Sequence, residues 1–339
     1  MIFLKKLPDV DELQNHYSLN ESQKKDRINK INEIKNILSG QDDRKIIIIG
    51  PCSADKQDSV LDYTNRLANL QEEVKENILI IPRIYTSKPR TTGTGYKGLL
   101  HNPNADKKED LFKGVIASRE LHLKVIKETG FYCADEMLYP EEIYYFMDLL
   151  AYMAVGARSV ENQGHRMVAS GVNIPIGLKN PTSGSKDSLV NSILASQASH
   201  HMIYRSWEVK CEGNPFAHAI LRGFINNSGK HIPNYHYEDI CEIHDKIIKS
   251  NVQNPSLIID CNHSNSGKNY IEQIRIAKEI FNICKTYKSL NKLIKGLMIE
   301  SYIIDGNQLV GGNIYGKSIT DSCLGWNKTE YLIKSLAFD

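Results

Sequence analysis

The feature that most constrains the fold is an alternation of short apolar runs with longer helical patterns, which begins at residue 45. Near-continuous apolar runs are typical of parallel strands that are covered on both faces. Eight such units spread over roughly 250 residues predict a (β/α)8 barrel, also called a TIM barrel. The candidate strands are Lys45–Gly50, Ile78–Tyr85, Phe131–Glu136, Gly156–Val160, Ile174–Lys179, His218–Arg222, Ser256–Asp260 and Leu297–Glu300.

Helical patterns separate these strands. The clearest are Val60–Val74, Pro140–Ala154, Ser188–Ser199, Tyr237–Ser250 and Ile271–Tyr287. A doubly wound open sheet is the alternative architecture, but no Gly-x-Gly-x-x-Gly pattern follows the first strand, so the barrel is favoured. A further run, His201–Tyr204, predicts an added β-hairpin before the sixth barrel strand.

Residues 1–44 differ from the rest because they show one clear helix and no strand pattern. Asn20 and Gln23 form a capping pair at the start of this helix, and Gly40 is placed to end it. A helix with one apolar stripe needs a surface to cover, either its own barrel or a partner subunit. We therefore divide the chain into an N-terminal extension, 1–44, and a barrel, 45–339. The stripe consists of Ile28, Ile31, Ile34, Ile37 and Leu38.

Composition narrows the class of function. The 339 residues carry 42 Lys and Arg against 40 Asp and Glu, a net charge of +2. Positive charge is therefore concentrated locally, which favours small anionic ligands over a nucleic-acid surface. No apolar stretch approaches the roughly 20 residues of a membrane span, and the N-terminal apolar run is too short for a signal peptide. Seven scattered cysteines without paired spacing suit reduced thiols, so we expect a cytoplasmic protein.

A basic loop follows the second strand. Arg83, Lys88, Arg90 and Lys97 lie within it, and Pro89 and several glycines shape it. Four cations on one loop repel one another unless an anion lies among them. A solvated basic loop is the simpler interpretation, but arginines held by proline and glycine suit forked recognition of phosphate or carboxylate. We predict an anion-binding loop.

Two sets of side chains lie where the predicted strands end, which in a barrel is the catalytic face. The cationic set is Arg83, Lys97, Arg158, Lys179 and Arg222, with Lys88 and Arg90 beside it. The second set mixes soft and hard ligands suited to a divalent transition metal: Cys52, His263, Glu300 and Asp321.

Each metal-ligand candidate has a simpler interpretation when it is taken alone. Cys52 could be a small buried hydrophobic residue, His263 could cap its own polar segment, and Asp321 could cap a following helix. Strands one, seven and eight are neighbours in a closed barrel, however, and this joint placement favours a metal site.

At these positions the chain resembles the type I 3-deoxy-D-arabino-heptulosonate 7-phosphate (DAHP) synthases, in particular the class regulated by aromatic amino acids. The matching motifs recur in the family's order from about residue 38 to Trp326. They are Gly50-Pro-Cys-Ser, Lys88-Pro-Arg-Thr, Gly156-Ala-Arg, Gly177-Leu-Lys-Asn, Leu221-Arg-Gly, Asp260-Cys-Asn-His-Ser-Asn-Ser, Glu300-Ser and Tyr315-Gly-Lys-Ser-Ile-Thr-Asp.

The resemblance implies a transferase that condenses phosphoenolpyruvate (PEP) with erythrose 4-phosphate and water to give DAHP and phosphate. This reaction is the first step of the shikimate pathway of aromatic amino acid biosynthesis. The resemblance also implies a divalent metal ion (Mn, Fe, Co or Zn) on Cys52, His263, Glu300 and Asp321. It assigns PEP to Arg83, Lys97, Ala157, Arg158, Lys179 and Arg222, and the aldose phosphate to Lys88, Pro89, Arg90 and Thr91.

Catalytic roles follow from the same resemblance. Cys52 and His263 act through the metal, and Lys179 is a candidate to protonate or orient the reacting groups. The reaction chemistry, rather than a matching family motif, leads us to expect that either Asp135 or Glu136 orients the attacking water. We expect a homo-oligomer (dimer or tetramer) in which residues 1–44 form a regulatory arm. We also expect feedback inhibition by phenylalanine, tyrosine or tryptophan.

Three departures from the family pattern stand out: Tyr96 replaces a tryptophan, Tyr302 replaces a histidine, and the stretch His201–Pro215 diverges. Two alternatives stay open. A 3-deoxy-D-manno-octulosonate 8-phosphate synthase shares the barrel and PEP site, but has an Asn-Arg-Ser type segment in place of Lys88–Thr91. A non-catalytic, ligand-sensing relative is expected to have lost a metal ligand or a PEP cation, and this chain retains them all.

Overall fold

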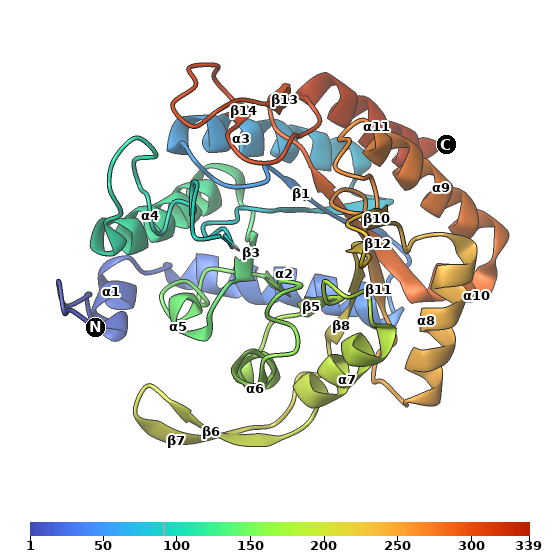
Figure 1. Ribbon diagram of the computed structural model, residues 1–339, viewed down its shortest axis with the longest axis horizontal. Coiled ribbons are helices and arrows are strands. Elements are labelled where there is room, and N and C mark those ends of the chain that lie inside the picture. The colour runs from blue at the N-terminus through green and yellow to red at the C-terminus, as the bar shows by residue number, and fades with distance from the viewer. Residues whose placement is uncertain (91) are drawn as a thin grey trace.

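Eight parallel strands form a barrel in the computed structural model, which describes residues 1–90 and 92–339 (Figure 1). The strands are hydrogen-bonded in the order β2-β1-β12-β11-β8-β5-β4-β3, and a parallel bridge from Arg83 to Ala134 brings the two outer strands together. This confirms the predicted barrel. The strands are β1 (Lys45–Gly50), β2 (Ile78–Pro82), β3 (Ala134–Met137), β4 (Tyr152–Val155), β5 (Ile176–Lys179), β8 (Ala217–Leu221), β11 (Leu257–Asp260) and β12 (Ile294–Glu300).

Helices surround the barrel and bury its outer face (Figure 1). The apolar strand residues are almost fully buried, as expected for parallel strands covered by helices. The helices are α3 (Gln57–Val74), α4 (Leu111–Thr129), α5 (Pro140–Ile143), α6 (Gln163–Gly171), α7 (Lys186–Gln197), α8 (Tyr237–Lys249), α9 (Glu272–Thr286), α10 (Lys288–Leu293) and α11 (Trp326–Phe338).

The prediction was wrong around the fourth strand. The expected helix over 140–154 is the single turn α5, and the strand is β4, four residues before the predicted Gly156–Val160. Ile143, Phe146 and Leu150 have helical spacing, and the apolar run of 151–155 continues it directly. A short buried strand and a buried helix cannot be separated by periodicity alone. As a result, Gly156, Ala157 and Arg158 lie beyond the strand, in the loop at its carboxyl end.

The N-terminal segment folds against the barrel as α1 (Val10–His16) and α2 (Glu21–Ser39). The predicted capping pair is present: Asn20 Oδ1 accepts from Gln23 N at 2.9 Å, and Gln23 Oε1 accepts from Asn20 N at 3.0 Å. Gly40 ends the helix in the left-handed conformation (φ 79°). The apolar stripe is buried except at Ile28, which is 55% exposed.

Helix α2 covers the amino-terminal end of the barrel. The Ser256 hydroxyl, just before β11, donates to the carbonyl of Leu38, and Arg27 donates to the carbonyl of Leu150, just before β4. Contacts to the starts of β11 and β4, which are three strands apart around the barrel, place α2 across this end (Figure 1). Its own barrel, rather than a partner subunit, therefore buries the apolar stripe.

The predicted hairpin is confirmed as β6 (His200–Tyr204) and β7 (Trp207–Cys211), which are antiparallel. Arg205 and Ser206 turn the chain with φ of 50° and 66°, as a two-residue type I′ connection requires. Arg205 forms an ion pair of 2.8 Å with Asp11 of α1, so the hairpin contacts the N-terminal arm.

Two further pairs of short strands complete the described structure. One hairpin pairs β9 (Phe224–Ile225) with β10 (His231–Ile232), and β13 (Ile304–Asn307) pairs with β14 (Lys317–Ser318) after the last barrel strand. Among the described helices, none combines the length and apolar character that a membrane crossing requires.

Candidate active site

The carboxyl ends of the barrel strands surround a cavity of about 180 Å³. Parallel strands of a closed barrel all end on one face, so loops that are distant in sequence meet there. Most of the residues selected from the sequence line this cavity. They are Arg83, Lys88, Pro89, Arg90, Ala157, Arg158, Lys179, Arg222, His263 and Asp321.

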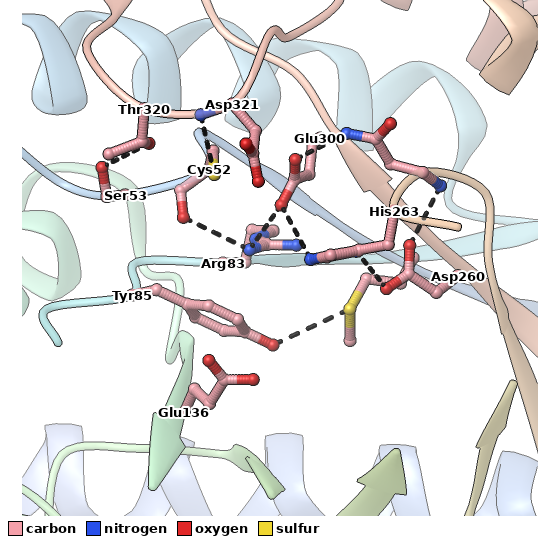
Figure 2. A network of polar contacts seen from close by, with 12 residues as sticks. Cys52, Ser53, Arg83, Tyr85, Glu136, Asp260, His263, Glu300, Thr320 and Asp321 are labelled. Carbon is pink, nitrogen blue, oxygen red and sulfur yellow. Dashed lines mark hydrogen bonds and ion pairs between the residues drawn. The ribbon is translucent and has the colours of Figure 1, made fainter. Parts of the chain in front are cut away.

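Three of the four predicted metal ligands form a compact cluster at one side of the cavity. The Cys52 Sγ atom and one carboxylate oxygen each from Glu300 and Asp321 lie within 4.8 Å of one another. Gly50 pairs with Glu300 across β1 and β12, and this pairing brings the two strand ends together. Figure 2 shows the three side chains facing one another.

The fourth predicted ligand, His263, approaches from the loop after β11. Its Nε2 lies 3.8 Å from Glu300 Oε1, and its Nδ1 lies 2.8 Å from a carboxylate oxygen of Asp260 (Figure 2). Although burial opposes ionisation, the charges of His263 and Lys179 hold the pKa of Asp260 well below its usual range. A carboxylate on one ring nitrogen leaves the other nitrogen free toward the cluster, an arrangement typical of metal-binding histidines.

The donor set fits a divalent transition metal. Glu300 Oε2 accepts from Asn262 Nδ2 at 2.6 Å, whereas buried Oε1 accepts no hydrogen bond from any described residue. Burial and the charge of Glu300 raise the pKa of the Cys52 thiol to about 11. A bound cation would favour the thiolate and satisfy the free carboxylate oxygen.

Two cations assigned to substrates by the resemblance contact this cluster. Lys88 Nζ lies 2.7 Å from Cys52 Sγ and donates to the Cys52 carbonyl at 2.8 Å. Arg83 Nη2 lies 3.2 Å from Glu300 Oε1. The structure therefore places Lys88 next to the metal-ligand candidates, a contact that sequence spacing did not predict.

Lys179 forms a buried ion pair at the opposite side of the cavity. Its Nζ lies 2.5 Å from Glu136 Oε1, and both side chains are almost fully buried. Burial alone would raise the pKa of Glu136, but Lys179, Lys88 and Arg83 lower it to about 2. This carboxylate is therefore ionised at neutral pH.

The structure distinguishes between the two acids considered for water activation. Glu136 lines the cavity, whereas Asp135 does not. Asp135 instead accepts hydrogen bonds from Thr86 N at 3.0 Å and Thr86 Oγ1 at 2.6 Å. Asp135 thus joins β3 to the segment after β2, and Glu136 is the acid that faces the site.

Arg158 and Arg222 enter the cavity from the ends of β4 and β8, the two strands that flank β5. Arg158 is exposed and Arg222 is half-buried. The side chain of Asn180 accepts from Arg222 N at 2.8 Å, which fixes the backbone from which that arginine extends. Burial lowers the pKa of Arg222, so an anion beside it would relieve its desolvation.

Lys97 and Thr91 are the predicted substrate-binding residues that are not among the described residues lining the cavity. Lys97 Nζ forms an ion pair of 2.6 Å with Glu109, and the residue is not among those lining the cavity. Thr91 lies outside the described residues. The neighbouring Arg90 does line the cavity, and its Nε donates to the Tyr96 carbonyl at 2.7 Å.

Sequence reasoning missed Tyr85, whose buried ring lies between Arg83 and Glu136 in Figure 2. The Arg83 guanidinium lies 4.0 Å and Lys179 Nζ 5.2 Å from the ring centroid. An aromatic face stabilises cations that have few other partners. The position of Tyr85 at the end of the second predicted strand was the sequence feature that could have indicated its place at the site. Reasoning from the sequence also missed His231, Ser264 and Lys268, which line the cavity.

Comparisons with known proteins agree with this geometry. The model of the DAHP synthetase I family matches residues 19–334. The Tyr-sensitive phospho-2-dehydro-3-deoxyheptonate aldolase of Escherichia coli K12 is 36% identical over 315 residues, which cover 90% of this chain and 85% of that protein. The phenylalanine-inhibited enzyme of Saccharomyces cerevisiae is 34% identical over 345 residues, covering 98% and 90%.

A solved structure extends the similarity to three dimensions. The phospho-2-dehydro-3-deoxyheptonate aldolase of Francisella tularensis SCHU S4 superposes with a TM-score of 0.91 at 33% sequence identity. The match covers 99% of this chain and 97% of that one.

Proposed function

Because the chain belongs to the DAHP synthetase I family, we propose that its cavity condenses PEP with erythrose 4-phosphate and water to form DAHP and phosphate. The observation that supports this most directly is that a candidate metal-ligand cluster and a cavity lined by cations lie together at the carboxyl end of the barrel. A Cys, Glu and Asp cluster with His263 beside it lies next to a cavity lined by six Lys and Arg side chains chosen from the sequence and by Lys268.

The cations that line the cavity can offset the electrostatic repulsion between the two anionic substrates. PEP and the sugar phosphate together bring about five negative charges near neutral pH. Two such anions reach bonding distance only among fixed positive groups. We assign PEP to Arg83, Ala157, Arg158, Lys179 and Arg222, and also to Lys97, which must then leave its pairing with Glu109.

The metal-binding residues would be Cys52, His263, Glu300 and Asp321. A divalent ion bound there supplies Lewis acidity to the aldehyde of erythrose 4-phosphate. The role of Asp260 is to orient His263 through the 2.8 Å contact to Nδ1. Comparison of the rates supported by Mn, Fe, Co and Zn would identify the preferred metal.

The remaining steps use residues of the cavity. A bond forms between C3 of PEP and the aldehyde carbon, water adds at C2, and the C2–O bond to phosphate breaks. Glu136, ionised and facing the cavity, is the group placed to orient the water. Lys179 Nζ lies 2.5 Å from Glu136 Oε1. We assign to Lys179 the role of donating a proton, either to the oxygen of the leaving phosphate or to the oxygen that the aldehyde becomes.

The aldose is assigned to Lys88, Pro89, Arg90 and Thr91. The deciding assay measures phosphate release from PEP with erythrose 4-phosphate or arabinose 5-phosphate, each with Mn, Fe, Co and Zn. We expect clear preference for erythrose 4-phosphate. Preference for arabinose 5-phosphate would establish the octulosonate alternative, and PEP binding without phosphate release under any condition would establish the non-catalytic one.

A regulatory function is favoured by a second cavity, of about 420 Å³, between α6 and the hairpin β6–β7. Val168, Val172, Met202 and Val209 give it a largely apolar lining, and Arg205 joins the hairpin to Asp11 of the arm. Relatives are named Tyr-, Phe- and Trp-sensitive. We propose that an aromatic amino acid binds in this second cavity and that the protein forms a homo-oligomer.

Inhibition by each of the three amino acids tests the regulatory proposal, with Val209→Trp as the variant that fills the cavity. We expect one amino acid to inhibit, the variant to lose that inhibition, and light scattering to report a dimer or tetramer. Insensitivity of the unaltered protein to all three would leave the arm with the structural role of covering the barrel end.

A further inference from the structure

A separate cavity of about 550 Å³ lies at the amino-terminal end of the barrel, the end opposite to the active site. It lies between the end of α2, the starts of β1 and β12, and parts of α8 and α10. Five residue steps along β1, about 17 Å, separate its Lys45 from Gly50 at the catalytic end. Its charged and titratable lining residues are Asp42, Asp43, Arg44, Lys45, His244, Lys292 and Lys295.

Lys295 is the unusual member of this lining. The residue is 8% exposed, and its side chain forms no hydrogen bond or ion pair with any residue of the described ranges 1–90 and 92–339, although its amine is open to the cavity rather than fully enclosed. A buried lysine is normally paired, because desolvation of an ammonium group is costly. A Cβ atom at Gly40 would lie 3.4 Å from Lys295 Nζ, so the end of α2 leaves this amine little room on that side.

A second lysine lies beside it. Ile46 pairs with Gly296, so Lys45 and Lys295 stand at the same level on the adjacent strands β1 and β12. Lys45 Nζ donates to the carbonyls of Asn291 and Ile294, at 2.9 and 2.6 Å, and retains its third N–H. Burial and the charge of Lys45 lower the pKa of Lys295 to about 8, with Asp43 opposing.

The other charges of the cavity do not neutralise this pair. Arg44 lies 2.6 Å from Asp42 and 2.7 Å from Glu33, so these groups satisfy one another. Asp43, which is exposed, is the acidic lining residue that remains to balance three lysines. The cavity therefore has an excess of positive charge around a lysine whose amine has no partner among the described residues.

We propose that this cavity binds a small polyvalent oxyanion, of phosphate or carboxylate chemistry, held mainly by Lys295 and Lys45. An anion here would give Lys295 its missing partner and relieve its repulsion from Lys45. The alternative role for Lys295 is to interact with the negative end of α2. The amine does lie beside this helix end, but it donates no hydrogen bond to a described carbonyl of α2, so its N–H groups stay available to an anion.

Site-resolved amine labelling tests the proposal. The full-length protein at pH 8 is treated with an amine-reactive reagent, and the labelling of Lys295 is followed by peptide mass spectrometry. Inorganic phosphate and citrate are titrated against sodium chloride at constant ionic strength, which separates phosphate from carboxylate recognition. Exposed Lys25 on α2 reports general reactivity in the same sample.

We expect saturating phosphate or citrate to slow Lys295 labelling at least about fivefold and to leave Lys25 unchanged. The half-protecting concentration should rise about tenfold in Lys45→Met or, where that variant folds poorly, in Lys292→Met. It should stay unchanged in Arg158→Ala, an active-site variant, which excludes a relayed effect of anion binding at the active site. Equal Lys295 labelling in all three salts, or protection that neither lysine variant weakens, would overturn the proposal.

Discussion

Two buried glutamates close in sequence provide a matched test of the electrostatics of the active site. Glu136 faces Lys179 and the cavity, whereas Glu142 on α5 accepts from Ser87 Oγ at 2.6 Å and does not line the cavity. Burial raises the pKa of Glu142 to about 8, while neighbouring cations lower that of Glu136 to about 2 against its own burial. The conservative changes Glu136→Gln and Glu142→Gln should therefore have opposite consequences.

The size of the effect follows from the pKa of Glu136. A fall from 4.5 to about 2 corresponds to about 3 kcal/mol of stability at 1.36 kcal/mol per pKa unit. Because the folded pKa is the lower one, this stability is fully present above pH 4.5 and is lost as the pH falls toward 2. Glu136→Gln should therefore lower the free energy of unfolding by about 3 kcal/mol at pH 7.

For Glu142 the pH dependence of stability has the opposite sign. Its folded pKa is the higher one, so the folded state favours the protonated carboxyl and loses stability as the pH rises from 4.5 to about 8. Glutamine imitates the neutral carboxyl. Glu142→Gln should consequently be near neutral at pH 5 and gain stability relative to the unaltered protein between pH 5 and pH 8.

Urea unfolding of the three proteins at pH 5, 6, 7 and 8 measures these differences, and steady-state kinetics give a second measurement. Glu136→Gln should lower kcat by about 10² or more through loss of water orientation, with an unchanged or lower KM for PEP because one negative charge is gone. Glu142→Gln should keep its kcat. Equal unfolding free energies of the two variants at pH 7, or a fully active Glu136→Gln enzyme, would refute the reasoning.

Three further changes test other parts of the structure. Cys52→Ala should abolish high-affinity divalent metal binding, measured by calorimetry on chelator-treated protein, and unaltered binding would remove Cys52 from the site. Arg90→Ala should raise KM for erythrose 4-phosphate at least about tenfold and that for PEP less than twofold; the reverse order would exchange the two assignments. Lys295→Met should raise the free energy of unfolding by up to about 1 kcal/mol below pH 8 in anion-free buffer, because the depressed pKa of Lys295 penalises its charged form while water in the cavity screens that charge, and this gain should vanish above pH 10.5. A less stable Lys295→Met protein at pH 7 would contradict that account.

Local sequence patterns determined the barrel and the positions of the candidate metal ligands along the chain. The isoleucine run of β1 and the Asn20–Gln23 cap of α2 have the predicted structure because backbone periodicity and capping involve residues close in sequence. Cys52, Glu300 and Asp321 were predicted to meet because a closed barrel brings all strand ends to one face.

Tertiary structure decided which partner each charged side chain selects. Nothing in the spacing of Lys88 or Lys97 indicates that one contacts Cys52 and the other Glu109. The same limit applies to β4, where a buried strand and a buried helix give the same apolar pattern.

Lys295 illustrates the reason most clearly. From the sequence it is one lysine before a buried strand. Only the packing of α2 over the barrel end shows that it lies beside Lys45 with no side-chain partner in the part of the chain that the structure describes. Periodicity and capping depend on a few neighbouring residues and can be read from the sequence. The environment of a charge depends on segments hundreds of residues apart, so only the folded chain determines it.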